Sequence, residues 1–342
     1  MDRVAQDRPS RPPAITDVAR AAGVSHQTVS RVLNQHPSVR PETRSRVLDA
    51  IADLGYRRNH AARALVTGRS EQLGVVVLGS LLFGPGSMLS AVEQLADQNG
   101  FVVSVASVHR DDPAEVARAV ERLLDQSVAG LVLIVPVANA QGALDEIPPG
   151  VPYVVIDGDL TREDPLATVD QAHGAYLATR HLLDAGHANV MHVHGPLDWF
   201  DSRGRMEGWQ RALDEAGVTP MEPMAGDWSL RSGYRIGTAL AQRPDVTAVF
   251  AANDHMALGI LRAMHDAGRR LPEDLSVVGF DDIPEAGYVL PGLTTVRPDF
   301  SAAARAGLRL LLEQVESGSR IVERRTVTAS LVERESVAPP RS

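Results

Sequence analysis

The chain has 342 residues, 44% of them hydrophobic, which is enough for two or three globular domains with sizeable cores. It has no apolar run near the roughly 20 residues of a membrane span, no signal peptide and no cysteine, which together predict a cytoplasmic protein without disulfides. The net charge of −9 conceals a division, because residues 1–70 carry 12 arginines against 6 acidic residues, and a basic head on an acidic body favours a phosphate-binding module joined to a regulatory domain.

The first 34 residues contain a leader and then two short helices. Residues 1–14 are polar, rich in proline and without periodicity, so we expect a disordered leader. In the stretch Ile15–Asn34, Thr16 and Ser25 are placed to cap two helices, and Gly23 allows the turn between them. Apolar stripes on the two helices can meet, which leaves a polar face on the second. This pattern predicts a helix-turn-helix, although a plain helical hairpin fits the pattern nearly as well.

The run TDVARAAGVSHQTVSRVLN, from Thr16 to Asn34, resembles the DNA-binding headpiece of the lac repressor family of bacterial transcription regulators. The resemblance implies that His26 and Gln27 read base edges and that Arg31 reaches guanine or phosphate. The residues it assigns to DNA contact in this run are Thr16, Ser25, His26, Gln27, Thr28, Ser30, Arg31 and Asn34.

A third helix is expected to close the DNA-binding domain, which we place at residues 15–58. Pro41 suits the first turn of this helix, and Arg40 stands where a serine or aspartate cap is more usual. Its expected core face consists of Val47, Leu48, Ile51 and Leu54.

Residues 59–69 resemble the hinge segment of the same family, with Asn59, Ala62 and Leu65 at matching positions and Arg58 in place of a more usual proline. The segment is good helix material but too short to be stable alone in water. The resemblance implies a helix that forms on DNA and wedges Leu65 into the minor groove. A plain surface linker is the alternative.

From Leu73 onward, short apolar runs alternate with helical segments, which predicts an α/β core of parallel sheets covered by helices on both faces. The number of units favours two doubly wound subdomains. The resemblance implies a periplasmic-binding-protein-like core over 70–342, with a ligand cleft between two lobes joined by three crossovers. We place lobe one at about 70–169 and 300–327, and lobe two at about 170–297 and 328–342.

Polar residues end several of the apolar runs, where ligands of parallel sheets bind. Asp157, Asn253 and Asp281 are in such positions, although each could simply cap the next helix. The resemblance adds Arg205, a sugar-stacking Trp228 and a cleft-lining Phe300, and Asp201 stands where the lac branch has a small hydroxyl residue. The implied effector-binding residues are Asp157, Asp201, Arg205, Trp228, Asn253, Asp281 and Phe300.

An indole face surrounded by acids and amides suits a carbohydrate, so we expect a repressor released by a mono- or disaccharide. A purine-type corepressor and an activating role remain alternatives. The partners expected are a pseudo-palindromic double-stranded operator and a second copy of the chain, because a two-fold axis must match that of the DNA. The C-terminal residues show no heptad pattern, which favours a dimer over a tetramer.

No enzyme, cofactor or metal site is predicted. The chain lacks a nucleophile elbow, a phosphate loop and a metal triad, and its headpiece argues against a transport protein. His192 and His194 share one face of a strand but have no third ligand nearby in sequence. The stretch FGPGS (83–87) lacks a full dinucleotide fingerprint and is interpreted as a cleft loop.

Overall fold

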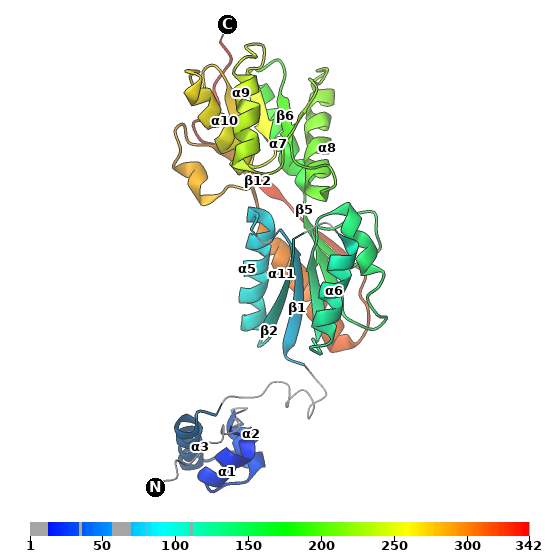
Figure 1. Cartoon of the computed structure of the whole chain (residues 1–342), viewed down its shortest axis with the longest axis vertical. Coiled ribbons are helices and arrows are strands. Elements are labelled where there is room, and N and C mark those ends of the chain that lie inside the picture. The colour runs from blue at the N-terminus through cyan, green and yellow to red at the C-terminus, as the bar shows by residue number, and fades with distance from the viewer. Residues whose placement is uncertain (1–12, 34–35, 57–69, 80, 110–111, 342) are drawn as a thin grey trace, which may run out of the picture. The chain divides into compact units, whose positions relative to one another are not determined.

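The computed structural model describes residues 13–33, 36–56, 70–79, 81–109 and 112–341. The chain forms two compact units, Met1–Arg69 and Ser70–Ser342 (Figure 1). Most of the predicted leader lies outside the described residues, as do Asn34 and the hinge positions Asn59, Ala62 and Leu65. The expectations for those positions therefore stay predictions.

Among its described residues, the first unit has the helices α1 (Ile15–Ala21), α2 (His26–Leu33) and α3 (Pro41–Leu54). Gly23 turns the chain between α1 and α2 with φ +64°, a backbone conformation that costs glycine little. The small core is made by one face of each helix, and its buried members are Val18, Ala19, Ala22, Val29, Val32, Val47 and Ala50. The predicted helix-turn-helix with a third closing helix is confirmed.

One of the two predicted caps is wrong. Helix α1 begins two residues earlier than a Thr16 cap implies, because Asp17 Oδ2 accepts the backbone N–H of Ala14 at 3.0 Å and makes Ala14 the N-cap. Thr16 therefore lies inside the first turn, where its side chain is exposed. Ser25 does cap α2, since its Oγ accepts the backbone N–H of Thr28 at 3.2 Å.

The core face of α3 is narrower than predicted. Pro41 is its first residue, and Arg40 precedes it without a side-chain cap, as expected. Val47 is fully buried, but Leu48 is 50% exposed and Leu54 is 37% exposed. Leu48 is one residue, or about 100°, further round the helix than Val47, and Leu54 is the last residue of α3. The other apolar side chains already fill the small core between the three short helices, so neither leucine is buried in it.

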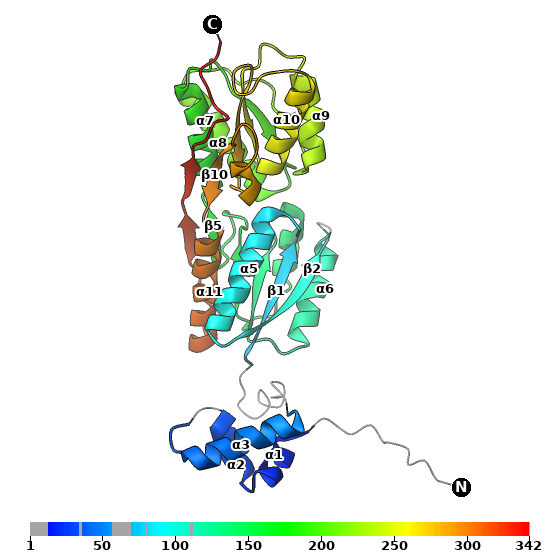
Figure 2. The ribbon, with the colours of Figure 1, turned by 90° about the vertical axis from the view of Figure 1, so that its left-hand side faces the viewer.

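Lobe one is a six-stranded sheet in which all pairs are parallel, in the order β11-β5-β4-β3-β1-β2. Its strands are β1 (Gln72–Leu78), β2 (Val102–Val108), β3 (Gly130–Ile134), β4 (Tyr153–Ile156), β5 (Leu166–Val169) and β11 (Arg324–Val327). Helices α5 (Phe83–Gln98) and α11 (Phe300–Ser317) lie side by side on one face, whereas α6 (Pro113–Leu124) and the 3₁₀ helix η1 (Ala138–Leu144) cover the other (Figure 2).

Lobe two is a second six-stranded sheet, in the order β12-β10-β9-β8-β6-β7, with only β12 antiparallel to its neighbour. Its strands are β6 (Met191–His194), β7 (Met224–Ala225), β8 (Ala248–Ala251), β9 (Ser276–Phe280), β10 (Thr294–Pro298) and β12 (Ala329–Val332). One face carries α7 (Gln171–Asp184) and α8 (Phe200–Glu215), the other α9 (Leu230–Leu240) and α10 (Asp254–Asp266). A 3₁₀ helix, η2 (Pro284–Gly287), precedes β10.

The chain crosses between the two sheets three times, at Asp170, Asp299 and Thr328. Asp170 and Asp299 cap α7 and α11, each by accepting a backbone N–H at 2.8 Å. The predicted architecture of two doubly wound lobes with three crossings is confirmed. None of the described helices is both long and apolar enough to span a bilayer.

Candidate DNA-binding face and effector cleft

The face of α2 that points away from the headpiece core is polar. Val29 and Val32, on its inner side, are 0% and 3% exposed. The side chains that the sequence assigned to base or phosphate contact are exposed or half-buried on the outer side: His26, Gln27, Thr28, Ser30 and Arg31. The helix can therefore enter a major groove without disturbing the core behind it.

Both ends of α2 are held in place. At its start, the Ser25 and Thr28 hydroxyls lie 3.0 Å apart. Near its end, Arg44 of α3 donates to the carbonyls of His36 at 2.9 Å and Val32 at 3.5 Å. An arginine is well suited to this position because the last carbonyls of a helix lack partners within it.

The positive charge of the N-terminal region lies mostly beyond the three helices. Residues 13–56 contain five arginines and four carboxylates, whereas residues 57–69 contain four arginines and no acidic residue. Attraction to phosphate depends on such cations, so residues 57–69 supply more net positive charge than residues 13–56.

In the core, three candidate effector residues have strained backbones. Asp157 directly follows β4 and Asp281 directly follows β9, with φ of 55° and 109°. Trp228, before α9, has φ of 69°. Residues with a Cβ rarely adopt these conformations, and such strain gathers at functional sites. Asn253 instead caps α10 by accepting the Met256 N–H at 2.9 Å. The alternative role considered from the sequence, that of a helix cap, therefore also applies to Asn253.

Arg205 of α8 is the centre of the polar cluster and is 3% exposed. Its Nε donates to Gln171 Oε1 at 3.0 Å, and its Nη1 donates to the Ala252 carbonyl. Its Nη2 lies 3.5 Å from Asp281 Oδ1 and 3.9 Å from Asp201 Oδ2. The sequence analysis predicted that Arg205, Asp201 and Asp281 share one site, but it did not predict the contact with Gln171.

Three buried carboxyls surround this one guanidinium. Burial raises the pKa of Asp201 to about 8, helped by the charges of Asp157 and Asp281 and opposed by Arg205. Burial also raises the pKa of Asp281 to about 6, with Arg205 opposing and Asp157 adding to the rise. The pKa of Asp157 is raised by burial against a hydrogen bond from the Thr168 hydroxyl. At neutral pH the cluster therefore holds at least one proton.

Trp228 closes one side of the cluster. Its indole covers Gly195, where a Cβ would lie 2.3 Å from the ring, and Asn253 Nδ2 donates to its carbonyl at 3.0 Å. Trp228 Nε1 and Asp157 Oδ2 are buried and have no hydrogen-bond partner. Buried polar groups without partners are uncommon in folded proteins, so these two atoms are candidates for contact with a polar ligand.

The cavity beside these groups has a volume of about 30 Å³, which is room for one or two water molecules. Trp199, which the sequence did not single out, lies edge-on to Trp228 with ring centroids 5.8 Å apart. The lining residues are Leu82, Phe83, Gly84, Pro85, Trp199, Asp201, Arg205, Trp228, Asn253 and Asp281.

Two predicted effector residues and the predicted cleft loop lie differently from the sequence expectation relative to this cavity, and the roles of Asp157 and Phe300 stay predictions. Asp157 and Phe300 are not among its lining residues. Phe300 packs behind Phe83, with ring centroids 6.1 Å apart. The FGPGS stretch does line the cavity, but as the first turn of α5 and not as a loop. Both aromatic residues are in sequence positions that fit a cleft, and only the packing of α5 against α11 decides which of them faces it.

Comparison with known proteins supports these observations. Residues 14–59 match the model for bacterial regulatory proteins of the lacI family, and residues 179–337 match a periplasmic binding protein-like domain. The Escherichia coli K12 lactose operon repressor is 34% identical over 336 residues, which is 97% of this chain and 92% of that protein. The chain belongs to the lacI family.

Other members are similar to this lacI-family chain along most of its length. The Haemophilus influenzae repressor PurR is 32% identical over 94% of this chain and 98% of its own. A crystal structure of the lac repressor dimer bound to operator and the anti-inducer ONPF superposes with a TM-score of 0.87, at 33% identity over 96% of this chain and all of that one. A regulator CelR–cellobiose complex gives 0.71, at 32% identity over 95% and 100%.

This lacI-family protein is a DNA-binding transcriptional repressor and not an enzyme, as its relatives are repressors. Its helix-turn-helix is the segment that the family model matches. Its relatives in the family include the lactose operon repressor and the repressor PurR. Membership of the family therefore does not decide the class of effector that this chain binds.

The histidine pair in β6 of this repressor belongs to the core. His192 is fully buried, stacks on Phe250 with ring centroids 4.7 Å apart, and bonds the Phe250 carbonyl through Nδ1 at 3.0 Å. Burial lowers the pKa of His192 to about 3, so the ring is neutral. Nowhere in the described parts of the chain do three or more His, Asp or Glu side chains gather as metal ligands would.

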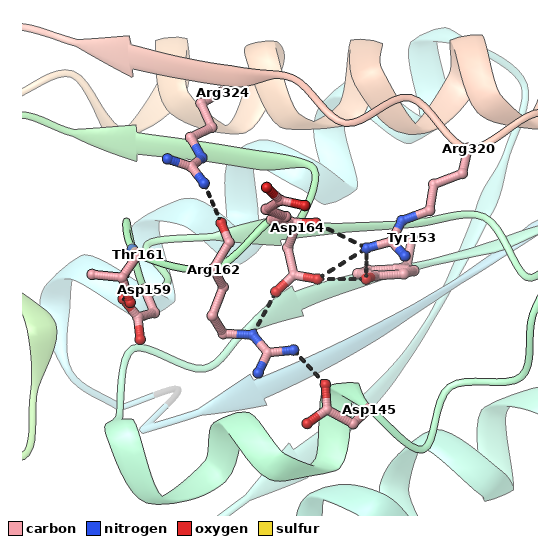
Figure 3. Close-up of polar contacts among 9 residues, drawn as sticks. Asp145, Tyr153, Asp159, Thr161, Arg162, Asp164, Arg320 and Arg324 are labelled. Atoms are coloured by element: carbon pink, nitrogen blue, oxygen red, sulfur yellow. Dashed lines mark hydrogen bonds and ion pairs between the residues drawn. The ribbon is translucent and has the colours of Figure 1, made fainter.

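A larger cavity, of about 640 Å³, lies at the other end of lobe one. Asp164 is buried there, accepting from Tyr153 Oη at 2.6 Å, Arg162 Nε at 2.7 Å and Arg320 Nη2 at 3.2 Å (Figure 3). Arg162 also reaches Asp145 at 2.5 Å. These groups satisfy one another and join the loop before β5 to the segment after α11, so we assign them to stability.

Proposed function

We propose that this repressor binds a pseudo-palindromic operator as a homodimer, with α2 of each headpiece in a major groove. Gln27 and His26 contact base edges, and Arg31 reaches guanine or phosphate. The remaining contacts to the sugar-phosphate backbone come from Thr16, Ser25, Thr28, Ser30 and Asn34. The polar outer face of α2 and the similarity to an operator-bound lac repressor dimer support this proposal.

Residues 59–69 form the second DNA contact in this proposal. The segment becomes helical on DNA, where Asn59 and Ala62 lie along the minor groove and Leu65 is the apolar wedge that opens a base step. Four arginines and no acidic residue between 57 and 69 favour its approach to phosphate.

The effector is a small carbohydrate that enters the cleft between the lobes. The observation that carries this proposal is the pair of buried, unpartnered polar atoms, Trp228 Nε1 and Asp157 Oδ2. The indole face stacks on a sugar ring, and hydroxyls pair with Asp201, Arg205, Asn253 and Asp281, while Phe300 supports Phe83 from behind. The similarity to a CelR–cellobiose complex favours a sugar, whereas that to PurR favours a purine.

Binding and release are coupled through the lobes. A cavity of about 30 Å³ is far smaller than the roughly 300–1,000 Å³ of typical ligand pockets, so a sugar must separate the lobes or displace the α5 turn. Strand β1 begins at Gln72, just after the hinge segment, and a shift of lobe one moves the two hinge helices of a dimer apart. Coupling of this kind is typically about 1–3 kcal/mol.

The test is a thermal-shift screen of the full chain with mono- and disaccharides and with nucleobases. Each hit is then added to the protein bound to an operator selected from random duplex DNA, with fluorescence anisotropy as the readout. We expect a saccharide to raise the melting temperature and to release the DNA. Stabilisation by a nucleobase and by no sugar would contradict the proposed effector class, and tighter DNA binding with the sugar would contradict release.

A further inference from the structure

The cleft has more buried carboxyl groups than positively charged groups. Asp157, Asp201 and Asp281 are 1%, 8% and 7% exposed, and the single cation among them is Arg205. That guanidinium is already shared between Gln171, a backbone carbonyl and the two carboxylates of Asp281 and Asp201. One guanidinium cannot neutralise three carboxylates, so in the ligand-free protein at least one of the carboxyls keeps a proton, and a bound cation can take the place of that proton.

Groups packed against the cluster from other elements do not make up the difference. Asp254 of α10 is another buried carboxyl, bonded to the Thr295 hydroxyl at 2.6 Å. Asp282, next to Asp281, is paired with Arg297 and with Arg334. His194 of β6 uses Nδ1 on the carbonyl of Gly195. Arg297 and Arg334 are therefore already paired with Asp282.

Asp201 is the carboxyl that faces the cavity with the least compensation. It lines the cavity, and its ion pair with Arg205, at 3.9 Å, is beyond hydrogen-bonding distance. Asp201 lies in the first turn of α8, where the helix dipole stabilises a negative charge. An exposed carboxylate would gain the same stabilisation, so the dipole does not explain why Asp201 is buried. A buried carboxylate of this kind calls for a positively charged or hydrogen-bonding partner.

Three of the other residues that line the cavity are aromatic. Trp199 and Trp228 meet edge to face, and Phe83 completes the lining from lobe one. Faces of such rings attract cations, and one cation is already held this way, since the Arg205 Cζ lies 3.8 Å from the Phe280 ring centroid and 5.6 Å from the Trp228 ring centroid. Independently, Trp228 Nε1 is a buried donor without a hydrogen-bond partner, and it can donate to an oxygen of a polar ligand.

We infer that the effector is a cationic saccharide, an amino sugar whose protonated ammonium group pairs with Asp201 between the aromatic walls. This inference rests on the proposed carbohydrate effector and adds its charge. The ammonium group supplies a positive charge to the three carboxyls. The hydroxyls of the sugar ring pair with Arg205, Asn253 and Asp281. Uronic acids and sugar phosphates are excluded, because they would bring a further anion into a buried negative site.

The test uses isothermal titration calorimetry on the full chain with matched ligands: glucosamine, N-acetylglucosamine, glucose and glucuronate, together with the galactose series and β-1,4-linked disaccharides of each kind. We expect the best amino sugar to bind at least 10-fold more tightly than its acetylated or hydroxyl counterpart, and the uronate not to bind. Binding at pH 7 should also release protons, because the ammonium ionises the Asp201 carboxyl. Titrations in buffers of different ionisation enthalpy measure this release, and a neutral sugar should show little of it.

The variant is Asp201→Asn, which keeps the shape of the side chain and removes its charge. It should lose both the preference for the amino sugar and the proton release, so that the amino sugar and its neutral counterpart bind about equally tightly. Asp214→Asn is the matched control, since Asp214 is an exposed carboxylate on the same helix. If Asp201→Asn fails to fold, the proton release that accompanies amino-sugar binding to the wild-type protein still tests the inference.

The outcomes separate this inference from the proposed function. Equal or tighter binding of neutral sugars overturns the inference and leaves the carbohydrate effector in place. Binding of a nucleobase and of no saccharide overturns both. A preference for the amino sugar that persists in Asp201→Asn assigns the charge recognition elsewhere and refutes the role of Asp201.

Discussion

Asp201→Asn should stabilise the ligand-free repressor, and the gain should grow with pH. The pKa of Asp201 is raised from 3.8 in an unfolded chain to about 8 in the fold, chiefly by burial. The folded protein therefore retains a proton that the unfolded chain releases. Stability is lost as pH rises through this window, from about 4 to about 8, because each pH unit in it costs the folded state about 1.4 kcal/mol.

The magnitude follows from the same shift. At pH 7 the wild-type cost is about 4 kcal/mol, and between pH 5 and pH 7 it increases by about 3 kcal/mol. Asparagine does not titrate, so the variant lacks this increase. For a folded unit of this size, about 3 kcal/mol corresponds to about 6–12 °C in melting temperature.

The assay is thermal unfolding of the full chain at pH 5 and pH 7, followed by circular dichroism, for wild type, Asp201→Asn and the exposed control Asp214→Asn. The difference between the melting temperatures of Asp201→Asn and wild type should be larger at pH 7 by several degrees, whereas the control should follow wild type. A difference that is the same at both pH values would refute the argument that Asp201 holds a proton in the folded protein. A stabilised variant with poorer ligand recognition is the usual relation between a strained site and its function.

The remaining predictions concern the DNA-binding parts and the network at the far end of lobe one. Leu65→Ala should weaken operator binding, measured by fluorescence anisotropy, while leaving sugar affinity nearly intact; unchanged DNA affinity would exclude the wedge. Gln27→Ala should cost about 1–3 kcal/mol in operator binding and relax the choice of base at one position, as read by selection from random duplexes. Asp164→Asn should cost about 2 kcal/mol of stability, because it weakens charge-assisted bonds from Arg162 and Arg320. Its control is Glu163→Gln, an exposed neighbour, and equal melting temperatures for the two variants would show that the network contributes nothing.

The sequence by itself determined the features that depend on local chemistry. Gly23, the Ser25 cap and the spacing of Val29 and Val32 define the helix-turn-helix, because turns, caps and helical faces are set by residues a few positions apart. The apolar runs that became β4 and β9 likewise placed Asp157 and Asp281 at strand ends. The sequence predicted the wrong cap where two nearby residues could both fix the start of a helix. The Asp17 carboxylate accepts the Ala14 N–H, so α1 begins before Thr16.

Only the tertiary structure decided which residues share a cavity and what charge they hold there. The cleft takes its walls from α5, α8 and the segments before α9 and α10, and no pattern within one segment reports a distance to another. The sequence therefore placed both Phe300 and the stretch that begins at Phe83 in the cleft, and it did not single out Trp199 or Gln171. Burial is likewise a property of the assembled fold: Asp201 is an ordinary first-turn carboxylate in the sequence, and its raised pKa exists only because two lobes exclude water from it.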